Sequence, residues 1–161
     1  TVALGGAVGA ILSVPLVRYL FFPVGRRTVT SPKGPVDVIA ASALPADGTP
    51  VQVAVVAPER RDGWTAHGPV AVGSAWVSRG ADGAPVAFSA VCPHLGCAIG
   101  YDTAEGVYRC PCHRSAFGRD GARQTGPSKR GLDPLPVRVV DGRVQVTFLR
   151  FRPDVAEREE V

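Results

Sequence analysis

Two short segments are the most informative part of this sequence: CPHLGC at residues 92–97 and CPCH at residues 110–113. Together they contain all four cysteines and two of the three histidines of the chain. Each segment follows a β-like run, so we place each one on a loop at the end of a strand. Thiolates and imidazoles on paired loops are soft ligands, and they indicate either zinc or an iron–sulfur centre.

Zinc and a framework of disulfides are the two simpler interpretations of these residues. Zinc sites usually pair cysteines at gaps of about two to four residues and then repeat the pair. Here four residues separate the cysteines of the first segment and one separates those of the second. A framework of disulfides alone leaves a histidine in each segment unexplained. Both interpretations therefore fit the spacing poorly.

The order Cys-x-His-x-Gly-Cys followed by Cys-Pro-Cys-His resembles the Rieske iron–sulfur family, and specifically its disulfide-bearing subgroup. The resemblance implies a [2Fe–2S] cluster in which two cysteines ligate one iron and two histidines the other. The ligands it implies are Cys92, His94, Cys110 and His113. The two remaining cysteines, Cys97 and Cys112, would then form a disulfide that holds the two loops together.

The resemblance also implies what the ligands do. Two neutral imidazoles in place of two thiolates raise the reduction potential to roughly −150 to +300 mV, against about −400 mV for plant-type ferredoxins. A ligand imidazole also has a second nitrogen, which allows proton uptake to accompany electron uptake. His94 or His113 would therefore contact a quinol and accept its electron with proton coupling. Leu95 would shield the cluster and help it to dock.

Three positions after the second segment bear on the potential or on the geometry of the loop. Ser115 stands where the family has a hydroxyl that donates to a cluster sulfide. Phe117 stands where high-potential members have a tyrosine, and because it has no hydroxyl we expect a lower potential, suited to menaquinol. Arg114 replaces the glycine that is usual before the serine, a departure from the family pattern that leaves the geometry of the loop open.

Residues 126–136 resemble the proline-rich loop that covers the cluster from a third side in this family. The segment contains Lys129 and Arg130. We expect these basic side chains to lie on a solvated face.

Residues 1–22 form an apolar run in which Arg18 is the only charged residue. Twenty-two helical residues extend about 33 Å, which is about one hydrocarbon core. We therefore predict a transmembrane anchor helix over residues 1–22. The polar stretch 23–35, which is punctuated by glycine and proline, is predicted to be a flexible linker.

Residues 36–149 are predicted to form the Rieske [2Fe–2S] domain. The composition is rich in valine, glycine and proline, and short β-like runs are separated by Asp-Gly turns such as 141–142. This favours a mainly β fold, a Rieske-type antiparallel β sandwich with an inserted cluster-binding subdomain at about residues 90–130. Residues 150–161 are predicted to be a frayed, charged C-terminal tail.

The resemblance implies the Rieske subunit of a cytochrome bc-type quinol–cytochrome c oxidoreductase, which is not catalytic alone. Its expected partners are a cytochrome b subunit and a c-type cytochrome within a dimeric multi-subunit complex, together with quinol and the lipid bilayer. Because disulfides persist outside the cytosol, we expect the domain on the periplasmic side of a bacterial inner membrane, with a single membrane pass.

Other functions remain open from the sequence. The small Rieske subunit of a molybdenum oxidase such as arsenite oxidase can also carry the disulfide. A soluble Rieske ferredoxin and a zinc-stabilised interaction module on a membrane stalk are further alternatives. The net charge of +4 is mild and evenly spread, which argues against nucleic acid as a partner. The chain contains no methionine, so we expect further residues upstream, including an export signal.

Overall fold

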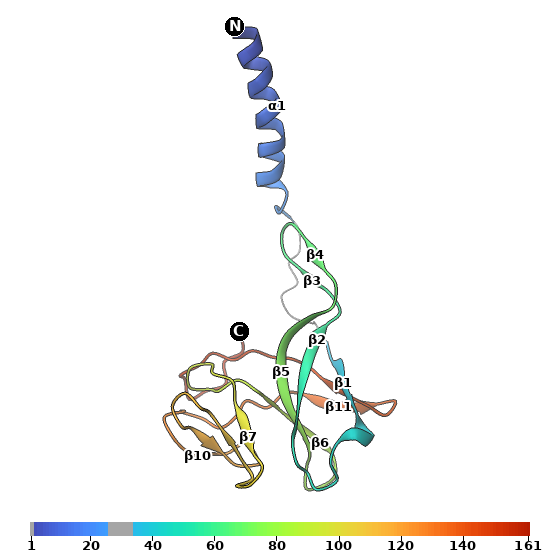
Figure 1. The fold of residues 1–161 in the computed structure, drawn as a ribbon, viewed down its shortest axis with the longest axis vertical. Helices are drawn as coiled ribbons and strands as arrows, with labels where there is room; N and C mark the ends of the chain where they lie inside the picture. Colours follow the sequence, from blue (N-terminus) through green and yellow to red (C-terminus); the bar gives the residue numbers. More distant parts are fainter. Residues whose placement is uncertain (1, 26–33) are drawn as a thin grey trace.

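The computed structural model describes residues 2–25 and 34–161. One helix stands away from a β-rich body (Figure 1). Most of the predicted linker, residues 26–33, lies outside the described residues. The elements are α1 (Val2–Phe21), β1 (Val36–Ala40), η1 (Ala41–Ala43), β2 (Val51–Ala57), β3 (Arg60–Arg61), β4 (Ala66–His67), β5 (Val70–Arg79), β6 (Pro85–Ser89), β7 (Gly100–Asp102), β8 (Val107–Arg109), β9 (Ala116–Phe117), β10 (Arg123–Thr125), β11 (Val137–Val140) and β12 (Arg143–Val146).

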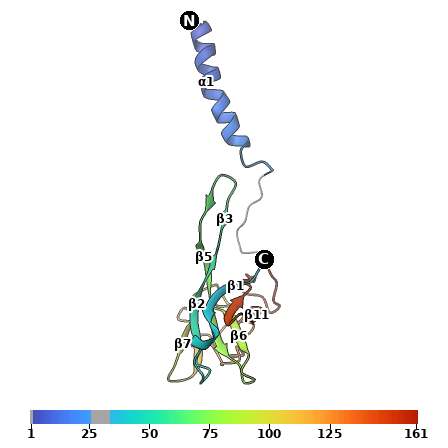
Figure 2. The ribbon, with the colours of Figure 1, turned by 90° about the vertical axis from the view of Figure 1, so that its right-hand side faces the viewer.

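The predicted N-terminal helix is confirmed as α1, whose apolar side chains are exposed from Leu4 onwards. The segment Leu4–Phe21 is long and apolar enough to cross a membrane. At the end of α1, the ring of Tyr19 stacks on that of Trp64 at 6.0 Å. Trp64 lies at the tip of the β3–β4 extension, which reaches towards α1 (Figure 2).

Among the described residues, three antiparallel sheets form the body of the protein and β3 and β4 pair in a fourth, two-stranded one, which confirms the predicted mainly β class. The strand orders of the three sheets of the body are β1-β12-β11, β2-β5-β6 and β10-β9-β8-β7. The predicted Asp-Gly hairpin is confirmed between β11 and β12, where Val140 pairs with Arg143. Asp141 and Gly142 have φ of 49° and 73°. Two consecutive left-handed residues give the turn that matches the right-handed twist of paired strands.

Two hydrophobic cores lie on opposite sides of the β2-β5-β6 sheet. Consecutive side chains of a strand point to opposite faces. Ala75 and Val77 of β5 therefore pack in one core, which β12 shares, while Trp76 between them packs in the other. The second core contains the two cysteines that are not in the disulfide. The β5 strand thus joins the base of the domain to the part that carries the candidate site.

The prediction of a frayed C-terminal tail is wrong. Residues 150–161, which we call the C-terminal strap, fold into a hairpin in which Phe151 is bridged to Glu160. The backbone N–H of Arg152 donates to the carbonyl of Glu159 at 2.8 Å. The sequence suggested fraying because this segment is charged, but its backbone groups pair with one another and with the rest of the domain.

The expectation of a solvated face at residues 129–130 is half wrong. Lys129 is exposed, but Arg130 is only 7% exposed and Asp133 only 4%. Their side chains form an ion pair in which Arg130 Nε lies 2.7 Å from Asp133 Oδ1. A buried charge is tolerated when it is paired and hydrogen-bonded, and the partner here comes from the same loop.

Candidate metal centre

Two loops of the same construction form the candidate site. In the first loop, residues 92–97, Cys92 N–H donates to Cys97 O at 2.8 Å and Gly96 N–H donates to Cys92 O at 2.9 Å. The second loop, residues 110–115, has the same pair of bonds eighteen positions later in the chain. Cys110 N–H donates to the carbonyl of residue 115 at 2.9 Å, and Arg114 N–H donates to Cys110 O at 3.1 Å.

The repeated pattern explains the position where the sequence departs from the Rieske family. Gly96 has φ of 78°, and Arg114 at the equivalent place has φ of 60°. Glycine adopts this left-handed conformation without a steric cost, whereas an arginine is strained by its Cβ. Despite the replacement of glycine by Arg114, the turn keeps the same hydrogen bonds as the first loop.

The structure brings like donors together across the two loops. The side chains of Cys92 and Cys110, both buried, lie next to each other as free thiols. Burial raises the pKa of the Cys92 thiol to about 11, and the neighbouring Cys110 adds to the increase. The rings of His94 and His113 meet edge to face with their centroids 4.8 Å apart. Each loop thus contributes one thiol and one imidazole.

The residues present fit a mixed cysteine–histidine cluster. Within the described residues, Nδ1 of His94 is the one buried side-chain nitrogen or oxygen without a hydrogen-bond partner. A buried polar atom without a partner is costly, and a metal ligand bond removes that cost. Two thiols beside each other and two imidazoles beside each other match the two kinds of iron in a Rieske centre.

The remaining two cysteines join the loops covalently. Cys97 and Cys112 form a disulfide, with 6.6 Å between their Cα atoms. Their sulfurs lie within 4.8 Å of the Cys110 sulfur. Proximity of three sulfurs would suggest a three-cysteine metal site, but two of them are bonded to each other and are not thiolates. The disulfide instead fixes the second loop against the first.

The two residues expected to influence the reduction potential, Ser115 and Phe117, are both fully buried. Ser115 and Phe117 each have 0% exposure. The Ser115 Oγ accepts the backbone N–H of Ser128 at 3.2 Å, which leaves its own proton available to donate. Phe117 packs in the second core, which also contains both free cysteines, and its ring offers no donor.

The outer side of the loops is open. His113 is exposed, and Leu95, at the tip of the first loop, is 56% exposed. An exposed apolar side chain beside an accessible imidazole suits contact with an apolar partner surface or ligand. The docking role of Leu95 and the quinol contact of His113 stay predictions.

A third loop, residues 126–136, covers the second loop. Gly126 has φ of 90°, and a Cβ built there would lie 2.4 Å from Ser115 Cα. Because only glycine allows so close an approach, this residue sets the distance between the second and third loops. The Ser115–Ser128 hydrogen bond joins the same two loops.

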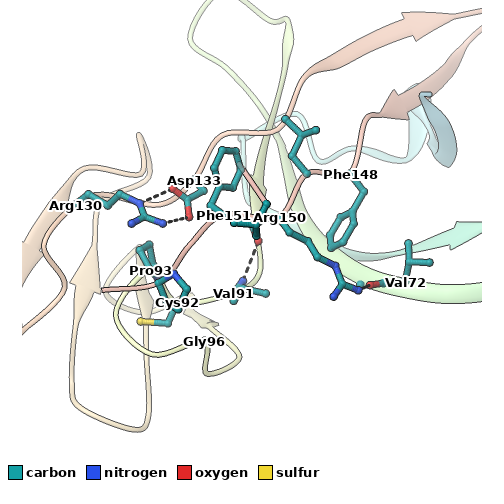
Figure 3. Close-up of a pocket in the computed structure, with 15 residues that line it drawn as sticks. Val72, Val91, Cys92, Pro93, Gly96, Arg130, Asp133, Phe148, Arg150 and Phe151 are labelled. Carbon is teal, nitrogen blue, oxygen red and sulfur yellow. Dashed lines mark hydrogen bonds and ion pairs between the residues drawn. The ribbon is translucent and has the colours of Figure 1, made fainter. Parts of the chain in front are cut away.

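Several supporting residues had no signal in the sequence. Trp76 Nε1 donates to Ile99 O at 3.0 Å, which fixes the chain just after the first loop. Arg130 and Asp133 line a pocket of about 360 Å³ together with Cys92 and Pro93 (Figure 3). A tryptophan in a strand and an Arg-x-x-Asp sequence in a loop are both common, so neither could be identified as support before the fold was known.

Comparisons with known proteins agree with this geometry. A family model described as Rieske [2Fe-2S] domain matches residues 34–139. The menaquinol:cytochrome c reductase iron-sulfur subunit of Geobacillus thermodenitrificans is 28% identical over 144 residues, which cover 87% of this chain and 81% of that protein. The cytochrome b6-f complex iron-sulfur subunit of Chlorobaculum tepidum is 36% identical over 66 residues, covering 41% of this chain and 36% of that protein.

The chain thus spans about a third of the cytochrome b6-f subunit that it matches. Among solved structures, the cyanobacterial plasma membrane Rieske protein from Synechocystis PCC 6803 aligns with a TM-score of 0.50 and 24% identity. That alignment covers 72% of this chain and 100% of the other. It shows a shared fold.

Proposed function

The chain belongs to the Rieske [2Fe–2S] domain family, and on that premise we propose that it is the iron–sulfur subunit of a membrane cytochrome bc-type complex. It takes an electron, with proton coupling, from quinol and passes it to a c-type cytochrome. The observation that carries the proposal is the pairing of two thiols and two imidazoles across two disulfide-linked loops. The menaquinol:cytochrome c reductase subunit of Geobacillus thermodenitrificans, which aligns over 87% of this chain and 81% of its own length, supports the proposal.

Four side chains hold the cluster in this proposal: Cys92, His94, Cys110 and His113. When bound, the cluster supplies a one-electron acceptor of raised potential. The burial of both cysteines keeps water from the sulfur side of the site. The exposed ring of His113 contacts the quinol and can hold its proton, and Leu95 docks beside it.

The surroundings of the ligands favour a low potential within the family range. Ser115 can donate its hydroxyl proton towards the site because its oxygen already accepts from Ser128. Phe117 has no hydroxyl to donate, so the reduced state lacks the stabilising hydrogen bond that a tyrosine at this position would supply. A lower potential suits menaquinol, and menaquinol is also the donor named for the relative from Geobacillus thermodenitrificans.

The helix α1 anchors the chain in the membrane in this proposal. We take Val2–Phe21 as a single-pass anchor in a bacterial inner membrane, because its apolar side chains are exposed from Leu4 onwards. The disulfide favours the periplasmic side for the domain. The cytochrome b subunit and a c-type cytochrome are its partners in a dimeric complex. The residues between the anchor and the domain serve as its tether.

Electron paramagnetic resonance of the dithionite-reduced full chain in detergent tests the proposal. We expect the low average g-value of a mixed histidine–cysteine cluster. His113→Ala should abolish that spectrum, whereas His67→Ala should retain it, because His67 lies exposed on β4, away from both loops. A metal-loaded wild-type protein without this spectrum, or one that contains only zinc, would refute the assignment of the centre.

Isolation of the native complex tests the partners. We expect the chain to co-purify with cytochrome b and c-type haem. Recovery with a molybdopterin subunit instead would assign it to a molybdenum oxidase. The relatives reported above are named as subunits of reductase and b6-f complexes, which favours the first result.

A further inference from the structure

The C-terminal strap contacts the first loop between two of the proposed ligands. Asp154 N–H donates to the carbonyl of Pro93 at 2.9 Å. Pro93 lies between Cys92 and His94, and its carbonyl belongs to the same planar peptide unit as the N–H of His94. A hydrogen bond that fixes this carbonyl therefore fixes the plane from which His94 extends.

The strap is itself held by the buried arginine of the third loop. Arg130 Nη1 donates to Val155 O at 2.6 Å and Nη2 donates to Arg152 O at 3.0 Å. The same guanidinium forms two hydrogen bonds with the carboxylate of Asp133, at 2.7 Å and 2.8 Å (Figure 3). Bidentate pairing of this kind orients a guanidinium strongly, so its remaining donors are aimed at the strap.

These contacts form a closed ring around the site. The disulfide joins the first loop to the second. The Ser115–Ser128 hydrogen bond joins the second loop to the third. Arg130 joins the third loop to the strap, and Asp154 joins the strap to Pro93 of the first loop.

We propose that the C-terminal strap is a positioning element for the first loop, which acts on Cys92 and His94 through the Pro93 carbonyl. The proposal rests on the assignment of these two residues as ligands. The strap also forms one wall of the pocket beside Cys92, since Phe151 and Pro153 line it. Loss of the strap both loosens the loop and admits water near the Cys92 sulfur. Solvent exposure is one of the factors that set the potential of an iron–sulfur centre.

Two substitutions at one residue compare a strap that keeps its backbone conformation and its hydrogen bond to Pro93 with one that loses both. Asp154 has φ of 58°. Asp154→Gly keeps the N–H donor and suits this φ, whereas Asp154→Pro removes the donor and cannot adopt the conformation. Both variants remove the carboxylate that lies 3.2 Å from Lys129 Nζ, so the loss of that ion pair is common to both.

Hydrogen exchange in the full chain gives a readout that does not depend on the cluster. In Asp154→Pro, the amides of Cys92 and Gly96, which are hydrogen-bonded within the first loop, should exchange at least tenfold faster than in Asp154→Gly. Amides of β11 and β12 (Val137–Val140 and Arg143–Val146) should exchange at the same rate in both. Equal exchange rates of the Cys92 and Gly96 amides in the two variants would overturn the proposal. An increase of the same size in the amides of β11 and β12 would also overturn it, because it would show a general loss of stability.

The midpoint potential of the loaded protein gives the second readout. We expect it to shift in Asp154→Pro and to stay at the wild-type value in Asp154→Gly, where a tenfold change in the one-electron equilibrium constant corresponds to about 59 mV. A chain truncated after Leu149 serves as the second variant if the proline variant does not fold. An unchanged potential and unchanged exchange in that chain would refute the role of the strap. A wild-type protein without a Rieske spectrum would instead refute the proposed function, while the exchange result would stand.

Discussion

Replacing Gly126 with alanine should push the third loop away from the second and destabilise the domain. The added Cβ would lie 2.4 Å from Ser115 Cα and 2.8 Å from Ser115 N, which are backbone atoms that cannot rotate away. The left-handed conformation at φ of 90° adds strain for any residue with a Cβ. We therefore expect the free energy of unfolding to fall through two separate causes.

The magnitude follows from adding the two causes. A non-glycine residue in the left-handed region costs about 1–2 kcal/mol. Overpacking against fixed atoms typically costs a further 1–3 kcal/mol, so the total is about 2–5 kcal/mol. Gly83→Ala is the matched control, because Gly83 has φ of 81° but no atom within 4 Å of its added Cβ. Gly83→Ala should therefore lose only the free energy of the left-handed conformation, about 1–2 kcal/mol.

Thermal unfolding of the two variants, followed by the fluorescence of the buried Trp76, measures the difference. For a chain of this length, 1 kcal/mol lowers the Tm by about 2–4 °C. Gly126→Ala should therefore unfold at a temperature about 2–12 °C lower than Gly83→Ala. Equal unfolding temperatures would show that the third loop does not approach Ser115 as closely as described, and the reasoning would fail.

Three further outcomes test other contacts of the site. Replacing both Cys97 and Cys112 with serine should cost about 3 kcal/mol of stability, the value for a closed loop of about 15 residues, and reductant should then have no further effect on the Tm. Phe117→Tyr should raise the midpoint potential, by about 59 mV if its hydroxyl binds the reduced state tenfold more favourably; a lower Tm with no change in potential would contradict a tuning role. Arg130→Met should lower the free energy of unfolding in urea because it removes the bidentate partner of the buried Asp133; the loss should stay below the cost of an uncompensated buried charge, about 3–5 kcal/mol, since Arg158 Nε remains 3.5 Å from Asp133 Oδ1, and adding Asp133→Leu should recover part of it.

The spacing of cysteine and histidine was enough to predict the loops, because a cluster requires particular ligand types in a particular order. The helix α1 and the strands β1 and β2 were also predictable, since they follow from an uninterrupted apolar run and from alternating side chains. The sequence did not predict the short strands β3, β4, β7, β9 and β10. Each has only two or three residues and is defined by its partners rather than by its own composition.

The predictions for Arg130 and for residues 150–161 were wrong for one reason: the burial of both depends on contacts with distant parts of the chain. Arg130 was expected in solvent because charged residues of a polar loop usually lie there. The strap covers it, and the strap was itself expected to fray. The two segments depend on each other, because Arg130 donates hydrogen bonds to the carbonyls of Arg152 and Val155 in the strap.

The sequence by itself determined the ligand types, their order along the chain and the β class of the domain, because ligand chemistry and strand periodicity are local properties. Only the tertiary structure showed that the Cys92 and Cys110 thiols lie side by side, that Arg114 adopts the left-handed conformation of Gly96, and that residues 150–161 close the ring around the first loop. Those facts depend on contacts between segments far apart in the chain, and such contacts form only when both sides are brought together by the fold.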